Sequence, residues 1–373
     1  MITIKKLNTV DQVKEFVKFP FLLYGNNPYW APPIIEDEME NFDQDSNPAF
    51  NHAEAHLFMA YKNEKPVGRV AAIINWYEVK EQQKSKIRFG WFDAIDDIEV
   101  TNKLLNEVEK VGRNHGLKYM EGPVGFSNMD KAGMLVEGFD ELNTMVTWYS
   151  LPYYKSHFEQ LGFVKEKEWV EFKIKIPVDG PSDRVKRFSN LILEKYDLKT
   201  VKFSDKRDML AHAEEMFSLI NKTYCHLSTF VPIQPEESRY YKEKYLRFIH
   251  PDFINCIADN KGNLVAFAIT MPSFAKALQH AKGRLFPWGW IHLLKARYFH
   301  NKAAFYLIGV QPKYQNKGLT AIIFKEMNEM FNRRGINEVE TNPELEENEA
   351  IQALWKSYDS RLHKRRRTYR RDL

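Results

Sequence analysis

The chain has 373 residues, of which 44% are hydrophobic and 14% aromatic. This length and composition predict one to three folded domains, with two the leading count, and they exclude a disordered chain. The formal net charge is +4, but residues 361–373 carry seven Lys/Arg and one Asp, so the other 360 residues sum to −2. Outside this tail, the chain therefore lacks the excess of positive charge that is typical of a nucleic-acid-binding domain.

Several sequence patterns that the chain lacks narrow the class of protein further. No run approaches 18 apolar residues, so no transmembrane helix is expected, and the start, MITIKKLNTVD, lacks the apolar region of a signal peptide. The cysteines Cys225 and Cys256 have no metal-ligand spacing, and the histidines show no HExxH-type spacing. These features predict a cytoplasmic protein without a metal.

The first half of the chain reads as strands alternating with helices. A strand at 2–7 precedes a helix that Thr9 or Asp11 caps and that runs to Tyr24, and residues 25–56 read as an irregular ordered loop. The later elements are a hairpin at 57–61 and 66–75, an exposed charged segment at 76–88, a strand from 89, a helix at 99–114, a strand at 119–122, a glycine-rich loop at 122–140, a helix ending at Gly162 and a strand at 170–176.

The same order returns in the second half. After a linking helix at about 182–194 come a strand at 198–203, a helix at about 206–223, a hairpin at 254–270 and a strand, loop and helix within 304–335. The chain thus predicts two copies of one fold. The boundaries are residues 1–177, a linker with its helix at 178–197, and residues 198–373 with an insertion at 272–300.

Residues 304–335 carry the strongest local signal. An apolar strand ends at Pro312, and the polar loop QNKGL leads into an amphipathic helix, so that Gly318 stands where the loop becomes a helix. Backbone N–H groups converge there and suit a pyrophosphate, although a glycine before a helix more often serves plain turn chemistry. Lys317 precedes the glycine, so the loop is neither a Walker motif nor a dinucleotide-binding GxGxxG motif.

The stretch from Gly309 through Thr320 resembles the acetyl-CoA signature of the GNAT acyltransferases, Q/R-x-x-G-x-G/A. Gln315 and Gly318 match this signature, and Thr320 replaces the final small residue. The following ENEAIQALWKSY resembles the family's N-x-x-A-x-x-L-Y helix through Asn348 and Leu354, whereas Ile351 stands at the alanine position.

The resemblance implies a mixed α/β (α+β) protein of two GNAT-like (acyl-CoA N-acyltransferase) domains, each a mixed, mostly antiparallel sheet flanked by helices. It implies acetyl-CoA or another acyl-CoA as co-substrate, and an N–H donor to the thioester oxygen at Val310. The implied cofactor-binding residues are Ile308, Val310, Gln315, Asn316, Lys317, Gly318, Leu319, Thr320 and Asn348.

The resemblance also implies direct attack of an amine on the thioester, which needs a base for the amine and an acid for the leaving thiolate. The family's tyrosine acid aligns with Trp355, so Tyr358, three residues later, is the substitute candidate. Glu340 and Glu344, near the end of the fifth strand of this copy, are the candidate bases. Each of the three also has a plain alternative as an ordinary surface or core side chain.

The first copy resembles the same fold, because FEQLGF at 158–163 looks like the family's YEKxGF helix end. Its counterpart of the pyrophosphate loop, DAIDDIEVTNK, has no glycine and four acids, which would repel a pyrophosphate. The first domain is therefore expected not to bind CoA in the usual way, and to form one wall of the substrate cleft.

Two basic segments leave alternatives open. The insertion at 272–300 is aromatic and basic; it reads as a helical hairpin covering the sheet, with a substrate lid or a membrane-surface helix as alternatives. The tail HKRRRTYRR at 363–371 reads as an exposed edge strand protected by charge, with nucleic-acid binding as the lesser alternative.

The sequence thus predicts an N-acetyltransferase-like enzyme that transfers an acyl group from acyl-CoA to an amine of a small molecule or peptide. The alternatives are a non-catalytic acyl-CoA binder, a transferase using a long-chain acyl-CoA or aminoacyl-tRNA, and a purely structural protein.

Overall fold

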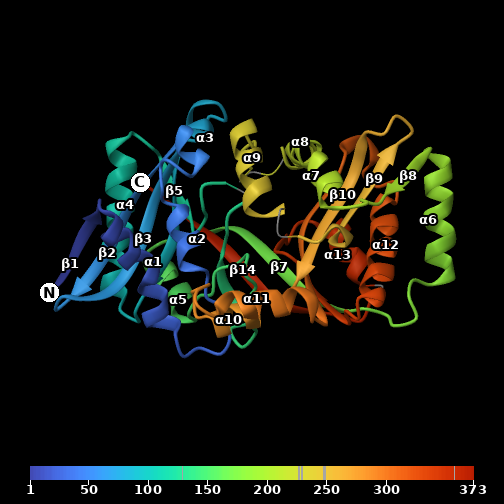
Figure 1. The fold of residues 1–373 in the computed structure, drawn as a ribbon. Coiled ribbons are helices and arrows are strands. Elements are labelled where there is room, and N and C mark those ends of the chain that lie inside the picture. Colours follow the sequence, from blue (N-terminus) through green and yellow to red (C-terminus); the bar gives the residue numbers. More distant parts are fainter. Residues whose placement is uncertain (128, 226, 228–229, 247–248, 357) are drawn as a thin grey trace.

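A single 14-stranded sheet runs through the protein from one end to the other (Figure 1). The computed structural model describes residues 1–127, 129–225, 227, 230–246, 249–356 and 358–373, without the side chains of residues 350, 351 and 353. The strands are β1 (Ile2–Leu7), β2 (Ala53–Lys62), β3 (Lys65–Asn75), β4 (Lys86–Ala94), β5 (Tyr119–Gly122), β6 (Met134–Glu137), β7 (Val164–Lys175), β8 (Leu198–Val201), β9 (Ile254–Asp259), β10 (Leu264–Pro272), β11 (Lys302–Val310), β12 (Glu338–Glu340), β13 (Glu344–Leu345) and β14 (Ser360–Asp372).

Helices flank this sheet (Figure 1). They are α1 (Val10–Tyr24), α2 (Ile35–Glu40), α3 (Trp76–Lys80), α4 (Ile98–Asn114), α5 (Tyr153–Gln160), α6 (Asp183–Lys195), α7 (Lys206–Ala211), α8 (Ala213–Tyr224), α9 (Pro235–Lys244), α10 (Ala275–Ala281), α11 (Gly289–Tyr298), α12 (Leu319–Arg333) and α13 (Glu349–Trp355). Short 3-10 helices are η1 (Pro48–Asn51), η3 (Pro251–Phe253) and η4 (Pro312–Tyr314).

The two halves repeat one arrangement of strands. The ladder is mainly antiparallel, but β4 pairs in parallel with β5, and β11 pairs in parallel with β12. The connection is α4 in the first case and α12 in the second, as a parallel crossover requires. Each helix buries its apolar stripe on its own half of the sheet, α4 through Val100, Leu104 and Val108 and α12 through Ile322 and Met327. The expected fold class, a mixed and mostly antiparallel sheet flanked by helices, is confirmed.

Two long strands join the halves. The order in the middle of the sheet is β5-β14-β7-β12, so β14 from the end of the chain lies between two strands of the first half. β7 in turn pairs along one side with β14 and along the other with β12 and β13 of the second half. The halves therefore share one sheet through an exchange of strands, which the repeating pattern in the sequence did not predict.

The element predictions were most accurate where periodicity was strong and least accurate in polar segments. The predicted first strand and the helix at 99–114 match β1 and α4, and Thr9 caps α1 in a capping box. The predicted loop at 25–56 contains α2 and η1, and the predicted helix at 206–223 is divided into α7 and α8. Residues 76–88 are not simply exposed, because Glu78 and Arg88 form a buried ion pair at 2.6 Å.

Candidate active site

The predicted cofactor loop at 315–320 leads from η4 into α12. Asn316 and Gly318 have φ values of 58° and 85°, in the left-handed region that favours asparagine and glycine. Gln315, Asn316 and Lys317 are exposed, whereas Leu319 is buried and starts α12. No side-chain cap serves this helix start, so its first N–H groups face the loop, as an anion site at a helix N-terminus requires.

Helix α6 lies against this loop, which the sequence reasoning did not foresee. A Cβ atom on Gly318 would stand 2.4 Å from Cδ1 of Ile192 and 3.2 Å from Cε1 of Phe188. Gly318 is therefore required by its backbone angle and by the packing of α6, independently of any ligand. The sequence does contain a sign of this packing, because Phe188, Leu191 and Ile192 recur at the spacing of one apolar helix face.

Lysines and tyrosines surround the loop on the α6 side. The Nζ atom of Lys317 lies 5.2 Å from the ring centroid of Tyr196 and 5.6 Å from that of Tyr314, and Lys313 lies over Tyr314 at 4.8 Å. The loop therefore combines exposed positive charge with aromatic surface, a pairing that suits an anionic ligand with an aromatic group.

At Val310, next to the loop, the N–H and C=O groups of β11 point away from β10. The N–H of Gln311 donates to the carbonyl of Val265, so Val310 and Ala266 form a non-hydrogen-bonded pair in the antiparallel ladder. The N–H and C=O of Val310 consequently point to the opposite side of β11. The Val310 carbonyl accepts there from Thr223 Oγ1 at 3.3 Å and from Gln315 Nε2 at 3.2 Å.

The backbone of Ile308, two residues earlier, has the same orientation. Its carbonyl accepts a hydrogen bond from Tyr224 Oη at 2.6 Å. The predicted residues Ile308, Val310 and Gln315 are therefore brought together. Tyr224 and Thr223, at the end of α8, are site neighbours that no feature of the sequence had marked.

β11 loses its partner strand on this side. Its parallel ladder with β12 ends at the pair Ala304 and Glu340, and Tyr306 is an extra residue that forms a bulge opposite β10. Beyond that point, Asn342 Nδ2 donates to the Tyr306 carbonyl at 2.7 Å, and β13 pairs with β7 instead. The strands thus diverge on the side to which the Val310 N–H points.

Glu344, one of the two predicted bases, stands beside this divergence. Burial raises its pKa to about 8, and the opposing influence is a hydrogen bond from Trp355 Nε1, which lies 3.0 Å from each carboxylate oxygen. The Trp355 ring packs edge-on against Phe324 at 4.9 Å and near Phe305 of β11 at 5.6 Å. A carboxyl with a pKa this close to neutrality is a plausible proton acceptor at physiological pH.

Tyr358, the predicted acid, lies next to the same tryptophan. Its N–H donates to the Trp355 carbonyl at 3.0 Å, and its half-buried side chain lines a small pocket together with Trp355, Phe305 and Phe324. Burial raises the pKa of the Tyr358 hydroxyl, which keeps it protonated. Asn348 directly precedes α13, and the side chain of Ile351 lies outside the described part of the chain.

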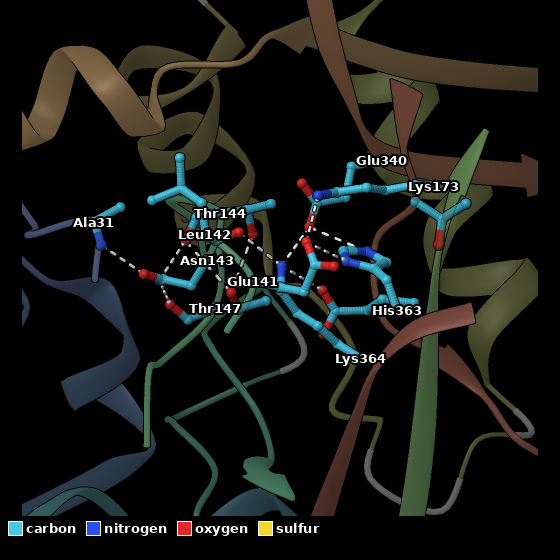
Figure 2. Close-up of polar contacts among 12 residues, drawn as sticks. Ala31, Glu141, Leu142, Asn143, Thr144, Thr147, Lys173, Glu340, His363 and Lys364 are labelled. Carbon is cyan, nitrogen blue, oxygen red and sulfur yellow. Dashed lines mark hydrogen bonds and ion pairs between the residues drawn. The ribbon is translucent and has the colours of Figure 1, made fainter. Parts of the chain in front are cut away.

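Glu340, the other predicted base, belongs to a separate buried network where the halves meet. Figure 2 shows Glu340 of β12 facing His363 and Lys364 of β14, with Glu141 and Lys173 alongside. Lys364 donates to Glu340, and His363 Nε2 lies 3.3 Å from the same carboxylate. Burial raises the pKa of Glu340, and the Lys364 ammonium opposes this shift. With this ion pair already formed, Glu340 is less suited than Glu344 to accept a substrate proton.

The same network contains three residues with metal-ligand chemistry. Ligand atoms of Glu171, Glu340 and His363 lie within 4.8 Å of one another. However, Lys364 Nζ bonds to Glu340 and lies 3.7 Å from Glu171, so an ammonium already occupies the position between the carboxylates. This arrangement neutralises the acids without a cation from solution.

The basic tail is not an exposed edge strand, and that prediction was wrong. β14 has neighbours on both sides, and acidic residues of adjacent elements neutralise its arginines. Arg366 pairs with Glu171 with both side chains fully buried, and Arg367 pairs with Glu168 at 2.7 Å. Pairing of this kind leaves less unpaired positive charge on β14 than the tail sequence alone suggests.

No family model matches the chain. The chain is 26% identical to Protein YghO of Escherichia coli over 372 residues, which cover 97% of this chain and 93% of that protein. It is 25% identical over 384 residues to the bacterial ceramide synthase of Caulobacter vibrioides, covering 100% of this chain and 98% of that protein.

Solved structures match the whole chain at low identity. A tandem GNAT protein from the clavulanic acid biosynthesis pathway superposes with a TM-score of 0.58 at 10% identity, covering 100% of this chain and 98% of that one. A GCN5-related N-acetyltransferase from Sphaerobacter thermophilus superposes with a TM-score of 0.54 at 9% identity, covering 100% and 95%. Among the described residues, no helix is long and apolar enough to cross a membrane. The chain therefore has the fold of these GNAT proteins.

Proposed function

We propose that the protein transfers an acyl group from acyl-CoA to the amine of an acceptor, with the acyl-CoA held by the second half of the chain. The observation that carries this proposal is the stretch of β11 after Ala304, which, among the described residues, has no strand beside it on the β12 side. Val310 lies at the end of this stretch, and Trp355, which holds Glu344, packs near its start at Phe305. The Val310 N–H points to the open side of β11, and Glu344, with a pKa of about 8, approaches the same strand through Trp355.

The proposed chemistry uses one group for each requirement. The neutral amine attacks the thioester carbonyl carbon, and the Val310 N–H donates a hydrogen bond to the oxygen that gains charge. The ionised carboxylate of Glu344 accepts the proton that the nitrogen loses. The carbon–sulfur bond breaks, and in this proposal the Tyr358 hydroxyl protonates the departing thiolate. The products are an amide and free CoA. A proton passing through solvent from the Glu344 carboxyl to the Tyr358 phenolate restores both side chains, so atoms and charge balance over the cycle.

The residues of the loop at 315–320 provide the fit to the donor. The first N–H groups of α12 and the exposed Lys317 face an anionic group, and the Tyr196 and Tyr314 rings add aromatic surface. In the first half, Asp97 caps the corresponding helix α4 and Lys62 pairs with it at 3.0 Å. A carboxylate at that helix start leaves no place for a phosphate, which supports a single donor site in the second half.

We propose long-chain acyl-CoA as the donor and a long-chain amine as the acceptor of this transfer. The relative named bacterial ceramide synthase aligns with the whole chain at 25% identity. Ceramide is the amide of a fatty acid and a long-chain amino alcohol, so its formation is the same bond-making step as the one proposed. The rival transferase of aminoacyl-tRNA loses support, because the arginines of β14 are neutralised by carboxylates within the sheet.

The test is release of free CoA thiol from acetyl-CoA and palmitoyl-CoA, measured with short amines and with a long-chain amino alcohol. The expected result is turnover of at least one pair, reduced about 100-fold or more in Glu344→Gln. Glu347→Gln is the matched control, because Glu347 is an exposed acid three residues away that pairs with Lys167. Tight acyl-CoA binding without turnover for any amine would instead establish the non-catalytic binder.

A further inference from the structure

Residues 284–299, here called the aromatic–basic segment, expose apolar side chains that a folded protein ordinarily buries. Within α11, only Gly289 is buried. The large apolar side chains of the segment that lie at the surface range from 40% to 79% exposed, and they are Phe286, Trp288, Trp290, Ile291, Leu294, Tyr298 and Phe299. An apolar patch this concentrated marks an interaction surface.

The charge around the patch has one sign. Residues 273–302 contain six Lys/Arg and no Asp or Glu. Lys302 is paired with Glu338 across the sheet, and the remaining five lie within or beside the aromatic–basic segment, as Lys276, Lys282, Arg284, Lys295 and Arg297. The partner must therefore be anionic as well as apolar.

Neighbouring contacts hold the segment in place. α10, which precedes it, is tied to the first half by hydrogen bonds from Gln279 Nε2 to the carbonyls of Pro28 at 2.8 Å and Trp30 at 3.0 Å. Gly283 accepts from the Ile35 N–H at 2.9 Å. α11 then lies beside α10 along one side of the molecule, where the two halves meet (Figure 1). The exposed side chains are thus presented by a fixed platform.

The platform adjoins an apolar pocket between the halves. Ser273, Phe274 and Ala275, at the start of α10, line this pocket together with Met145 of the first half and Tyr306 of β11. Tyr306 is the bulge residue at the divergence of β11 from β12. A ligand in this pocket therefore contacts β11 at Tyr306, four residues before the proposed oxyanion donor Val310.

We propose that the aromatic–basic segment docks the protein on the surface of an anionic phospholipid bilayer. Tryptophan, tyrosine and phenylalanine side chains partition into the interface between lipid headgroups and acyl chains, and lysine and arginine attract anionic headgroups. The docked orientation places the pocket beside α10 at the membrane surface, where a long-chain amine resides. This second part rests on the proposed function, whereas the docking itself does not.

Sedimentation of the full-length protein with phospholipid vesicles, without acyl-CoA or amine, tests the docking. We expect binding to vesicles of phosphatidylcholine with about 30% phosphatidylglycerol at about 0.1 M salt, little binding to phosphatidylcholine alone, and weakening as salt rises. Phe286→Ser/Trp288→Ser and Lys295→Glu/Arg297→Glu should each reduce binding at least about tenfold.

Two matched controls make the result specific. Phe188→Ser/Leu191→Ser removes exposed apolar side chains from α6, and Lys206→Glu/Arg207→Glu reverses exposed charges on α7. Both should bind as the wild type does, and circular dichroism with thermal unfolding should show all four variants folded. The proposal is overturned if the wild type ignores anionic vesicles or if segment and control variants lose binding equally. It is also overturned if the segment variants abolish self-association instead, which would identify a second copy of the chain as the occupant.

Failure of this experiment is distinct from failure of the proposed function. Vesicle binding needs no catalytic chemistry, and CoA release from water-soluble substrates needs no vesicle. A protein that turns over soluble amines but ignores vesicles would keep the acyltransferase proposal and lose the docking surface.

Discussion

The chemistry proposed for this protein depends most on Glu344, a carboxyl placed where it costs free energy to ionise. Within the described part of the chain, the indole N–H of Trp355 donates to both oxygens of this carboxylate. Trp355 stands at the position of the tyrosine in the GNAT helix motif that this segment resembles. The replacement removes an acid from that position, but it supplies an N–H that favours the ionised form of the neighbouring base. The tryptophan is thereby compatible with catalysis.

The first prediction concerns the pH dependence of transfer. Because Glu344 must be ionised to accept a proton, the rate should rise with pH through about 8. In Trp355→Phe the hydrogen bond that lowers the pKa of Glu344 is lost, so the rising limb should move to higher pH. Steady-state rates from about pH 6 to about pH 10 measure this shift. A limb that stays in place, or moves down, would show that Glu344 is not the titrating base.

The second prediction concerns stability at the same residue. The pKa of Glu344 is raised from 4.5 to about 8 on folding, so its contribution to stability is fully present below about 4.5 and is lost as pH rises through 8. Glu344→Gln should therefore gain stability relative to the wild type between about pH 5 and about pH 9, by on the order of a few kcal/mol. Urea unfolding of the wild type and of Glu344→Gln at both pH values measures how their difference in stability changes, and Glu347→Gln is the control. Equal stability of wild type and Glu344→Gln at both pH values would contradict the buried position of the carboxyl.

At the scale of elements, β14 is the feature that departs most from expectation. Its arginines suggested an edge, yet it lies in the middle of the sheet because β7 and neighbouring segments supply carboxylates along its length. Arg366 and Glu171 are the fully buried pair in this arrangement, and Arg366 also donates to the Trp148 carbonyl. Removing Arg366 leaves Glu171 with the more distant Lys364 ammonium, at 3.7 Å, as its remaining counter-charge in a fully buried place.

The third prediction follows from that pair. Arg366→Leu should lower the free energy of unfolding by about 3–5 kcal/mol, because Glu171 loses its principal counter-charge. Arg366→Leu/Glu171→Leu should recover a large part of that loss, since the two apolar side chains fill similar space. Urea unfolding of the three proteins at neutral pH measures both effects. A double variant no more stable than the single one would show that the ion pair is not the source of the loss.

The fourth prediction addresses the exchange of β7 and β14. Because β14 completes the sheet of the first half and β7 completes that of the second, residues 1–180 and 181–373 produced together as separate chains should purify as a one-to-one complex. Each piece alone should aggregate or remain unfolded, because each lacks a central strand. Two independently folded, non-associating pieces would contradict the shared sheet.

Sequence reasoning was sufficient for the local elements and insufficient for this exchange. Apolar periodicity predicted β1, α4 and α12 because each element has one buried face, and the loop at 315–320 was located from its glycine and the helix behind it. Nothing local in residues 360–372 says which strand they will join, since the carboxylates that neutralise them lie almost 200 residues earlier in the chain. The Glu344–Trp355 contact was also missed. It depends on how α13 packs back against β13, which the residues of either element alone do not determine.

In the molecule as a whole, the two halves contribute different parts of the proposed site. The second half offers the donor loop and the diverging strands, and the first half contributes Met145 to the pocket and anchors α10. The aromatic–basic segment lies along one side of this junction (Figure 1). A protein built in this way should bind its donor at one end and accept its amine where the halves meet.

The proposed transfer depends first on binding of the donor at the loop at 315–320, and a calorimetric titration of acyl-CoA measures this binding directly. A substitution at Gly318 itself would confuse the result, because its φ of 85° strains any other residue and a side chain there would press on Ile192 of α6. Asn316→Asp is better, because Asn316 is exposed at φ 58°, aspartate tolerates that angle, and a negative charge is added beside the helix start. Asn63→Asp is the matched control, an exposed asparagine at φ 51° in the turn between β2 and β3.

We predict that palmitoyl-CoA binds the wild type with one site per chain, that Asn316→Asp weakens binding about fivefold or more, and that Asn63→Asp leaves it unchanged. Acetyl-CoA in the same titration reports how much of the affinity comes from the acyl chain. Absence of binding of either donor to the wild type, or equal binding by the two variants, would contradict the placement of acyl-CoA on this loop.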